Sequence, residues 1–130
     1  MSARELKRIL MVDDEADIRT VACLSLEALG GFTVQLCDSG SEAAKTAMAF
    51  NPDLILLDVM MPGMDGPSTL KTLRAQTETA AIPVIFMTAK VQAQEVDHYK
   101  KLGALDVIAK PFDPMTLAAN VSQIWMNAYV

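Results

Sequence analysis

The feature that most constrains the fold of this sequence is the alternation of short apolar runs with longer amphipathic segments. The runs cover residues 9–12, 32–36, 54–57, 84–87 and 107–109. Each run is bounded by charge, Gly or Pro, and three of the five are almost purely apolar. Strands that are buried on both faces of a sheet have this composition. We therefore predict five buried strands.

The segments between the runs are long enough for helices. The first helix is predicted over residues 17–29. Its inward stripe is predicted at helical spacing, at Ile18, Val21, Ala22, Ser25 and Leu29. A second helix is predicted to run to about Phe50, because Ser39 and Glu42 have the spacing of a capping box.

Proline and glycine mark the bounds of the remaining three helices. Pro67 is expected to open the third helix, since proline is tolerated in a first turn. Residues 91–102 predict a fourth helix that Gly103 ends. Asp113 followed by proline is expected to cap a fifth helix, which runs towards Trp125.

Strict alternation of strands and helices implies right-handed crossovers and a parallel sheet with helices on both faces. For a chain of 130 residues we predict an α/β fold in a single domain over residues 1–130. The expected architecture is a flavodoxin-like, doubly wound (βα)5 sandwich with strand order 2-1-3-4-5. A half-Rossmann unit would need a glycine-rich turn after the first strand, and residues 12–16 contain no glycine. This argues against a dinucleotide site.

Composition excludes several other classes of protein. The net charge of −5 argues against a nucleic-acid surface, which needs clustered basic residues. No apolar stretch is long enough for a signal peptide or a membrane span, so we expect a soluble, cytoplasmic protein with no membrane contact. Cys23 and Cys37 follow no metal or redox spacing, and we interpret them as reduced thiols in the interior.

Polar residues follow four of the predicted strands, and ligands bind beyond the carboxyl ends of strands in open α/β sheets. These residues are Asp13, Asp14 and Glu15, then Asp58, then Thr88 with Ala89, and finally Lys110. A single aspartate there would be an ordinary helix cap or turn residue. Three aspartates on one rim repel each other unless a positive charge lies among them. A magnesium ion, which binds oxygen ligands, is the natural partner.

These residues resemble the receiver domain of two-component response regulators. The resemblance covers nearly the whole chain. It rests on the sequence at residues 9–15, 52–58 with 60–66, 83–89, and 103–104 with 110–112. The four pieces occur in the order and at the separations of the family.

The resemblance implies a phosphoryl acceptor and a metal site. Asp58 would accept the phosphoryl group. Mg²⁺, with Mn²⁺ as a substitute, would be bound by the carboxylates of Asp14 and Asp58, by the backbone carbonyl of Met60, and by Asp13 through a coordinated water. The chain would not be an enzyme in its own right but would assist its own phosphorylation and dephosphorylation.

The resemblance also implies partners for the phosphoryl group. Lys110 would pair with the phosphoryl oxygens, and Thr88 would hydrogen-bond one of them after transfer. The phosphoryl group would come from a phosphohistidine of a histidine kinase or a histidine phosphotransfer protein. Charge stabilisation and positioning are also what phosphoryl transfer requires on physical grounds. Gly63 and Gly66 would allow the loop after Asp58 to bend close to it; ordinary turn glycines are an equal alternative.

One position departs from the family. Members commonly carry an aromatic residue three positions before the lysine, and it rotates inward as the threonine moves. That position is Val107 here. We therefore expect Thr88 and the following loop to move, but we expect no aromatic rotation. The output would still use the face formed by the fourth helix, the fifth strand and the fifth helix, towards a downstream protein that the sequence does not identify.

Three alternatives to a stand-alone response regulator remain open. The chain could be a phosphorylation-independent interaction module of the same architecture, although the complete acid set argues against it. It could be the receiver fragment of a longer regulator whose output domain is missing. A flavin-binding electron carrier would need a hydroxyl-rich loop after the first strand, where this sequence has three acidic residues. His98, the single histidine, is interpreted as a solvated surface residue.

Overall fold

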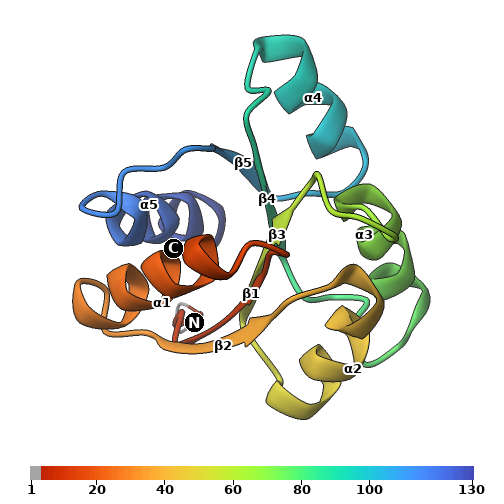
Figure 1. The fold of residues 1–130 in the computed structure, drawn as a ribbon, viewed down its shortest axis with the longest axis horizontal. Helices are drawn as coiled ribbons and strands as arrows, with labels where there is room; N and C mark the ends of the chain where they lie inside the picture. Colours follow the sequence, from red (N-terminus) through yellow and green to blue (C-terminus); the bar gives the residue numbers. More distant parts are fainter. Residues whose placement is uncertain (1–3) are drawn as a thin grey trace.

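Five parallel strands form the centre of this computed structural model, which describes residues 4–130 (Figure 1). The first three residues of the predicted domain lie outside the described part of the chain. The strands are β1 (Arg8–Val12), β2 (Thr33–Cys37), β3 (Leu54–Asp58), β4 (Val84–Thr88) and β5 (Asp106–Ala109). Their order in the sheet is β2-β1-β3-β4-β5, and every neighbouring pair is parallel. The predicted flavodoxin-like topology is therefore confirmed.

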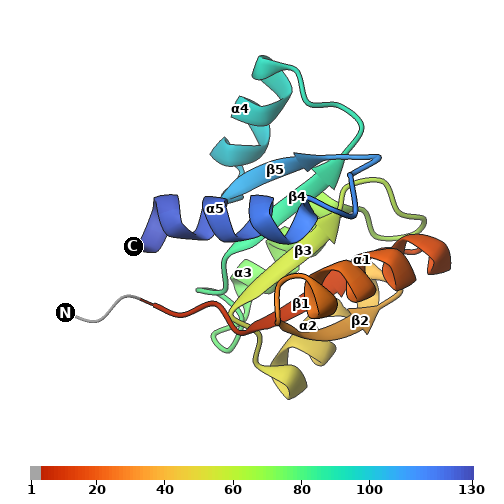
Figure 2. The same cartoon turned by 90° about the vertical axis from the view of Figure 1, so that its left-hand side faces the viewer.

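A helix follows each strand. The helices are α1 (Ala16–Ala28), α2 (Gly40–Phe50), α3 (Gly66–Ala75), α4 (Ala93–Lys101) and α5 (Leu117–Tyr129). Helices α1 and α5 cover one face of the sheet, and α2 and α3 cover the other (Figure 1). Helix α4 packs beside β5 at the edge of the sheet. Figure 2 shows the sheet from the side, with both chain termini at the end opposite the strand arrowheads.

The central strands have no solvent-facing side. All five residues of β3 and of β4 are buried. Leu54 and Leu56 point into the core under α1 and α5, whereas Ile55 and Leu57 point into the core under α2 and α3. This two-sided burial explains why the runs show no alternation of polar and apolar residues. It also makes the carboxyl end of the sheet a rigid platform for the residues that follow.

The buried face of the first helix is rotated slightly about the helix axis relative to the predicted stripe. Ala22 and Ser25 of the predicted stripe are buried, but Val21 is 38% exposed and Leu29 is 53% exposed. Leu26, which the stripe omitted, is fully buried. Leu29 is the C-cap residue and still continues the helical backbone, so its exposure follows from the same rotation of the buried face towards Leu26.

Two helix starts also differ from their predictions. The side chain of Ser39 makes no capping hydrogen bond, so the predicted capping box of α2 is wrong. Helix α5 begins at Leu117, with Thr116 as its N-cap, instead of directly after a cap at Asp113. The Asp113 carboxylate accepts a hydrogen bond from the backbone N–H of Met115 (2.9 Å), which builds a turn ahead of the helix. The third helix opens as predicted: Pro67 lies in the first turn, and Asp65 accepts from the N–H of Ser68 (2.9 Å).

Several compositional predictions can be compared with the described residues. Both cysteines are free thiols; Cys37 is buried as predicted, but Cys23 is only partly buried. His98 is exposed, in agreement with its interpretation. Within residues 4–130, no helix combines the length and apolarity that crossing a membrane requires.

Candidate functional site

The ends of four strands bring the predicted site residues to one edge of the sheet. Asp58 is the last residue of β3 and Thr88 is the last of β4, and both are almost completely buried. Asp13 follows β1 and is fully buried, while Asp14 beside it is exposed. Lys110 follows β5. The parallel register of the sheet is what places these residues side by side.

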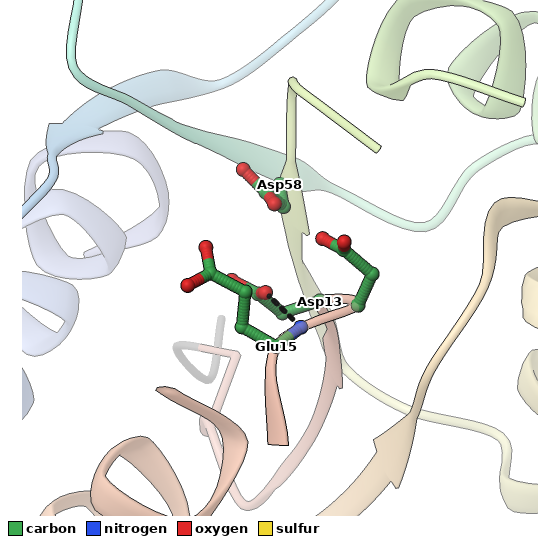
Figure 3. Close-up of side chains that lie close together, drawn as sticks. Asp13, Glu15 and Asp58 are labelled. Atoms are coloured by element: carbon green, nitrogen blue, oxygen red, sulfur yellow. Dashed lines mark hydrogen bonds between the residues drawn. The ribbon is translucent and has the colours of Figure 1, made fainter. Parts of the chain in front are cut away.

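Carboxylates crowd this edge. Asp13, Asp14, Glu15 and Asp58 each offer a carboxylate oxygen, and these oxygens all lie within 4.8 Å of one another. Figure 3 shows the carboxylates of Asp13, Glu15 and Asp58 facing a common space. The backbone N–H of Glu15 donates to Oδ1 of Asp13 at 2.9 Å, which fixes the turn from β1 into α1.

Lys110 supplies the cation among these carboxylates. Its Nζ lies 3.0 Å from Oδ2 of Asp13, 3.3 Å from Oδ1 of Asp58 and 3.6 Å from Oε1 of Glu15. The side chain is only 14% exposed, so Lys110 is not a solvated surface lysine. Burial lowers the pKa of this ammonium, but its contacts with Asp13 and Asp58 outweigh burial and raise the pKa overall. Lys110 therefore remains charged at neutral pH.

One ammonium does not balance the site. Burial, followed by the nearby charge of Asp13, raises the pKa of Asp58 from 3.8 to about 6, and the contact with Lys110 offsets only part of this rise. Oδ2 of Asp58 is buried, and it has no hydrogen-bond partner among the described residues. A buried polar atom without a partner is costly. The site thus has unused capacity to bind a positive group.

The donor set fits a hard divalent cation. The available ligands are carboxylate oxygens, one of them the unpartnered Oδ2 of Asp58, and Mg²⁺ prefers oxygen ligands of this kind. Met60 lies two residues after Asp58 on the adjoining loop, and its side chain is exposed. The backbone there is free of strand pairing, as a carbonyl ligand would require.

Glycine allows the loop after β3 to lie against the site. The N–H of Gly66 donates to the carbonyl of Val59 at 2.9 Å. A Cβ atom at Gly66 would lie 2.7 Å from the carbonyl oxygen of Asp58 and 2.8 Å from Cα of Val59, closer than real contacts allow. Gly63 has a φ of 76°, which L-residues rarely adopt. Both glycines therefore have a structural role close to the site.

The Thr88 hydroxyl already has one partner. Its Oγ1 accepts a hydrogen bond from the backbone N–H of Lys90 at 3.1 Å, which connects the end of β4 to the loop before α4. A hydroxyl can accept and donate at the same time, so its proton remains available for a further acceptor. Val107 is half-buried and, like Tyr99, packs against the core that contains Phe86.

Two residues near the site have contacts that sequence patterns did not reveal. Glu15 was noted beside the aspartates, but its ion pair with Lys110 depends on the direction of both side chains. Nη1 of Arg19 donates to the backbone carbonyl of Asp13 at 2.8 Å. One signal for Arg19 does exist in the sequence. A cation near a helix N-terminus opposes the helix dipole, so its presence there indicates a specific partner.

Comparison with known proteins identifies the family. Residues 9–122 match the model of the response regulator receiver domain. This match covers most of the chain, which therefore belongs to the response regulator receiver family. Receiver domains are phosphorylation-controlled switches of two-component signalling, generally without catalytic activity of their own, and they typically bind Mg²⁺ at an acidic pocket.

Individual relatives give the same result. The chain is 36% identical over 115 residues to the DNA-binding response regulator MtrA of Mycobacterium tuberculosis, a match that covers 88% of this chain and 49% of that protein. It is 38% identical over 118 residues to the phosphate regulon transcriptional regulatory protein PhoB of Escherichia coli, which covers 91% of this chain and 51% of that one. The chain thus spans about half the length of these curated relatives.

Solved structures of similar chains share the fold. The chemotaxis response regulator CheY4 of Vibrio cholerae superposes with a TM-score of 0.83 at 29% identity, over 92% of this chain and 99% of that one. The N-terminal domain of a response regulator receiver protein from Methanoculleus marisnigri superposes with a TM-score of 0.74 at 36% identity, over 92% and 96% of the two chains.

Proposed function

We propose that this chain is a phosphorylation-controlled switch in a two-component phosphorelay and that Asp58 accepts the phosphoryl group. The observation that carries the proposal is the environment of Asp58. Its carboxylate is buried at the carboxyl edge of the sheet, with Oδ1 against Lys110 at 3.3 Å and Oδ2 without a partner among the described residues. One oxygen thus faces a cation, while the other has no protein partner in the described part of the chain and can take a further bond.

The expected donor is a phosphohistidine of a histidine kinase or a histidine phosphotransfer protein. In the transfer, a carboxylate oxygen of Asp58 forms a bond to phosphorus and the phosphorus–nitrogen bond of the donor breaks. The electron pair of that bond returns to the imidazole nitrogen, which then takes up a proton. A carboxylate is a competent nucleophile for such a reversible step.

Asp14, Asp58 and the carbonyl of Met60 would hold Mg²⁺ directly, with Asp13 acting through a water; Mn²⁺ would serve in its place. When bound, the ion supplies charge stabilisation for the phosphoryl oxygens. Lys110 stabilises the same oxygens from the side of β5, where its Nζ already lies near Asp13 and Asp58. Loss of the phosphoryl group requires attack of water on phosphorus, which restores the Asp58 carboxylate and releases phosphate. The chain would assist both steps through these same groups.

Thr88 would report the modification. A phosphoryl group carries about two negative charges and strong acceptor oxygens. The Thr88 hydroxyl can donate to one of these oxygens while it still accepts from the N–H of Lys90, so the loop before α4 would follow it. We expect the change to reach a downstream protein through the face formed by α4, β5 and α5. We place the protein in the cytoplasm, without direct contact to nucleic acid or membrane.

Labelling with a small phosphodonor tests the acceptor. The protein is incubated with MgCl₂ and acetyl phosphate and then analysed by intact mass spectrometry. We expect the mass gain of one phosphoryl group on wild type and on the control Asp97→Asn, whose carboxylate lies exposed on α4. Asp58→Asn should gain none. Wild type without a mass gain, or equal labelling of Asp58→Asn at the same site, contradicts the proposal.

A second arrangement is favoured by the length of the relatives. The chain spans about half of MtrA or PhoB, and this length fits the receiver part of a longer regulator. The rival arrangement is a single domain over residues 1–130 that works alone. The gene sequence beyond the present chain distinguishes these two readings. A constitutive interaction module is distinguished by partner affinity, which would be equal with and without a phosphoryl mimic on Asp58.

A further inference from the structure

The backbone of Asp13 is held on both sides of its Cα atom: its N–H lies in the peptide shared with Val12, and its carbonyl lies in the peptide shared with Asp14. The backbone N–H of Asp13 donates to the carbonyl of Cys37 at 3.1 Å, which extends the pairing of β1 with β2 by one residue. The carbonyl of Asp13 accepts from Nη1 of Arg19 at 2.8 Å. Arg19 lies in the first part of α1, so the guanidinium bridges the helix to the end of the strand.

The two aspartates of this turn are fixed in different ways. Both carboxylate oxygens of Asp13 have partners: Oδ1 accepts from the N–H of Glu15, and Oδ2 accepts from Lys110. In the part of the chain that the structure describes, no protein group donates to the carboxylate of Asp14, which is exposed. The direction of the Asp14 side chain therefore depends on the backbone that carries it, and that backbone depends on the Asp13–Asp14 peptide plane.

Arg19 binds this carbonyl although carboxylates are available nearby. Arg19, Asp38 and Glu42 line the same surface hollow of about 410 Å³, beside Cys37 and Thr46. Among residues 4–130, Arg19 nevertheless forms no ion pair within 4.0 Å, and its side-chain hydrogen bond goes to the Asp13 carbonyl. Because no ion pair with the described residues fixes the guanidinium, its hydrogen bond to the Asp13 carbonyl is the contact that holds it near the helix N-terminus.

We propose that Arg19 is a positioning residue for the metal site, which fixes the Asp13–Asp14 peptide and thereby directs the Asp14 carboxylate towards the oxygens of Asp13 and Asp58. This inference rests on the proposed role of these carboxylates in binding Mg²⁺. Without the guanidinium the Asp13–Asp14 peptide can rotate, and the exposed carboxylate of Asp14 has no other contact to restore its direction. Residues that orient metal ligands typically change metal affinity by about 10- to 100-fold when they are replaced.

Metal affinity is the first measurement. Isothermal titration of the purified protein with MgCl₂ compares wild type, Arg19→Met and Arg19→Lys. Met keeps most of the apolar stem but removes the donor. We therefore expect the dissociation constant of Arg19→Met for Mg²⁺ to be about tenfold higher than that of wild type. Lys keeps a donor and the charge, and it should restore most of the affinity. The matched control is Arg8→Met, because Nε of Arg8 likewise donates to a backbone carbonyl, that of Phe50 at 3.0 Å, at the other end of β1.

The second measurement needs no metal. Amide hydrogen exchange in the presence of EDTA should be faster at Asp14 and Glu15 in Arg19→Met than in wild type, and unchanged in Arg8→Met. Circular dichroism confirms that each variant is folded.

The outcomes separate the two proposals. If wild type binds no Mg²⁺, the proposed metal site is wrong, and so is the positioning role of Arg19. If wild type binds Mg²⁺ and Arg19→Met binds it equally well, only the positioning role is overturned. A loss of affinity that Arg8→Met reproduces, or that Arg19→Lys does not relieve, also overturns the positioning role, because it indicates a general effect on the fold.

Discussion

At the scale of single residues, the site is dominated by unbalanced negative charge. Lys110 contacts three carboxylates, yet the pKa of Asp58 is still raised to about 6. A carboxyl group with a higher pKa in the folded protein than in the unfolded chain favours folding while it is protonated. That contribution is fully present below the unfolded value of 3.8 and is lost as the pH rises towards 6. In the absence of metal, Asp58 therefore destabilises the fold at neutral pH.

We predict that Asp58→Asn stabilises the metal-free protein. Removing the buried charge should raise the free energy of unfolding by about 3 kcal/mol at pH 7.5, because the pKa rises from 3.8 to about 6 and one unit of pKa shift corresponds to about 1.4 kcal/mol. Near pH 4 the difference should nearly vanish. Urea unfolding in EDTA at the two pH values measures both quantities, and the Asp97→Asn variant is the control. A stabilisation that is equal at both pH values would show that the effect is not electrostatic.

Among single residues, the sequence best predicted the location of those that directly follow a strand. Asp13, Asp58, Thr88 and Lys110 converge because each follows a strand that apolar composition makes recognisable. The contacts of Glu15 and Arg19 were not predictable, because they depend on side-chain directions across the turn into α1. Periodicity identifies the face of an element that is buried, but it does not identify which polar groups meet.

At the scale of elements, the strands matched their predicted positions closely, and the helix starts were the weaker part. Buried parallel strands have a composition that few other structures share. A capping signal, by contrast, competes with local turns. Asp113 uses its carboxylate for a turn ahead of α5, and Ser39 makes no capping bond in α2. The same residue types stabilise either structure, so their spacing alone does not decide between them.

The loop between β3 and α3 allows a direct test of the role of glycine. We predict that Gly66→Ala destabilises the protein by about 2–3 kcal/mol, because its Cβ would meet the backbone of Asp58 and Val59 at less than 3 Å. Gly63→Ala is the matched comparison in the same loop. It has a positive φ but no atom within 4 Å of the new Cβ, so it should cost about 1 kcal/mol.

Thermal unfolding of the two glycine variants measures the difference. Gly66→Ala should also weaken phosphorylation by acetyl phosphate, because the contact that it disturbs is with the carbonyl of Asp58 itself. Equal destabilisation by the two substitutions would mean that backbone conformation, and not close packing, sets the requirement for glycine.

At the scale of the whole molecule, stability is distributed unevenly. Helices α2 and α3 each place several side chains in the core, whereas α4 has no fully buried residue. Helix α4 is connected to the core through the partly buried Tyr99, whose ring packs edge-on against Phe86 with ring centroids 5.2 Å apart. An element with few buried contacts opens at low free energy.

We predict that α4 exchanges its backbone amides faster than the other helices. Hydrogen exchange followed by mass spectrometry on the unphosphorylated protein should show α4 peptides labelled at least tenfold sooner than those of α2 and α3. Tyr99→Ala should accelerate exchange in α4 further and leave α2 unchanged, while His98→Ala, which removes an exposed neighbour, should have little effect. Uniform exchange across the helices would contradict this distribution of stability.

The contact between Lys110 and Asp13 also has a consequence for the synthesis of the protein. The two residues are separated by 97 positions in the chain, and Lys110 follows the last strand of the sheet. A nascent chain that has left the ribosome only as far as β4 already carries Asp13 and Asp58, but it has no cation between them. Such a chain carries the carboxylates of the site without the ammonium that offsets their charge. The contact between the cation and the carboxylates can therefore form only after the last strand of the sheet has been synthesised.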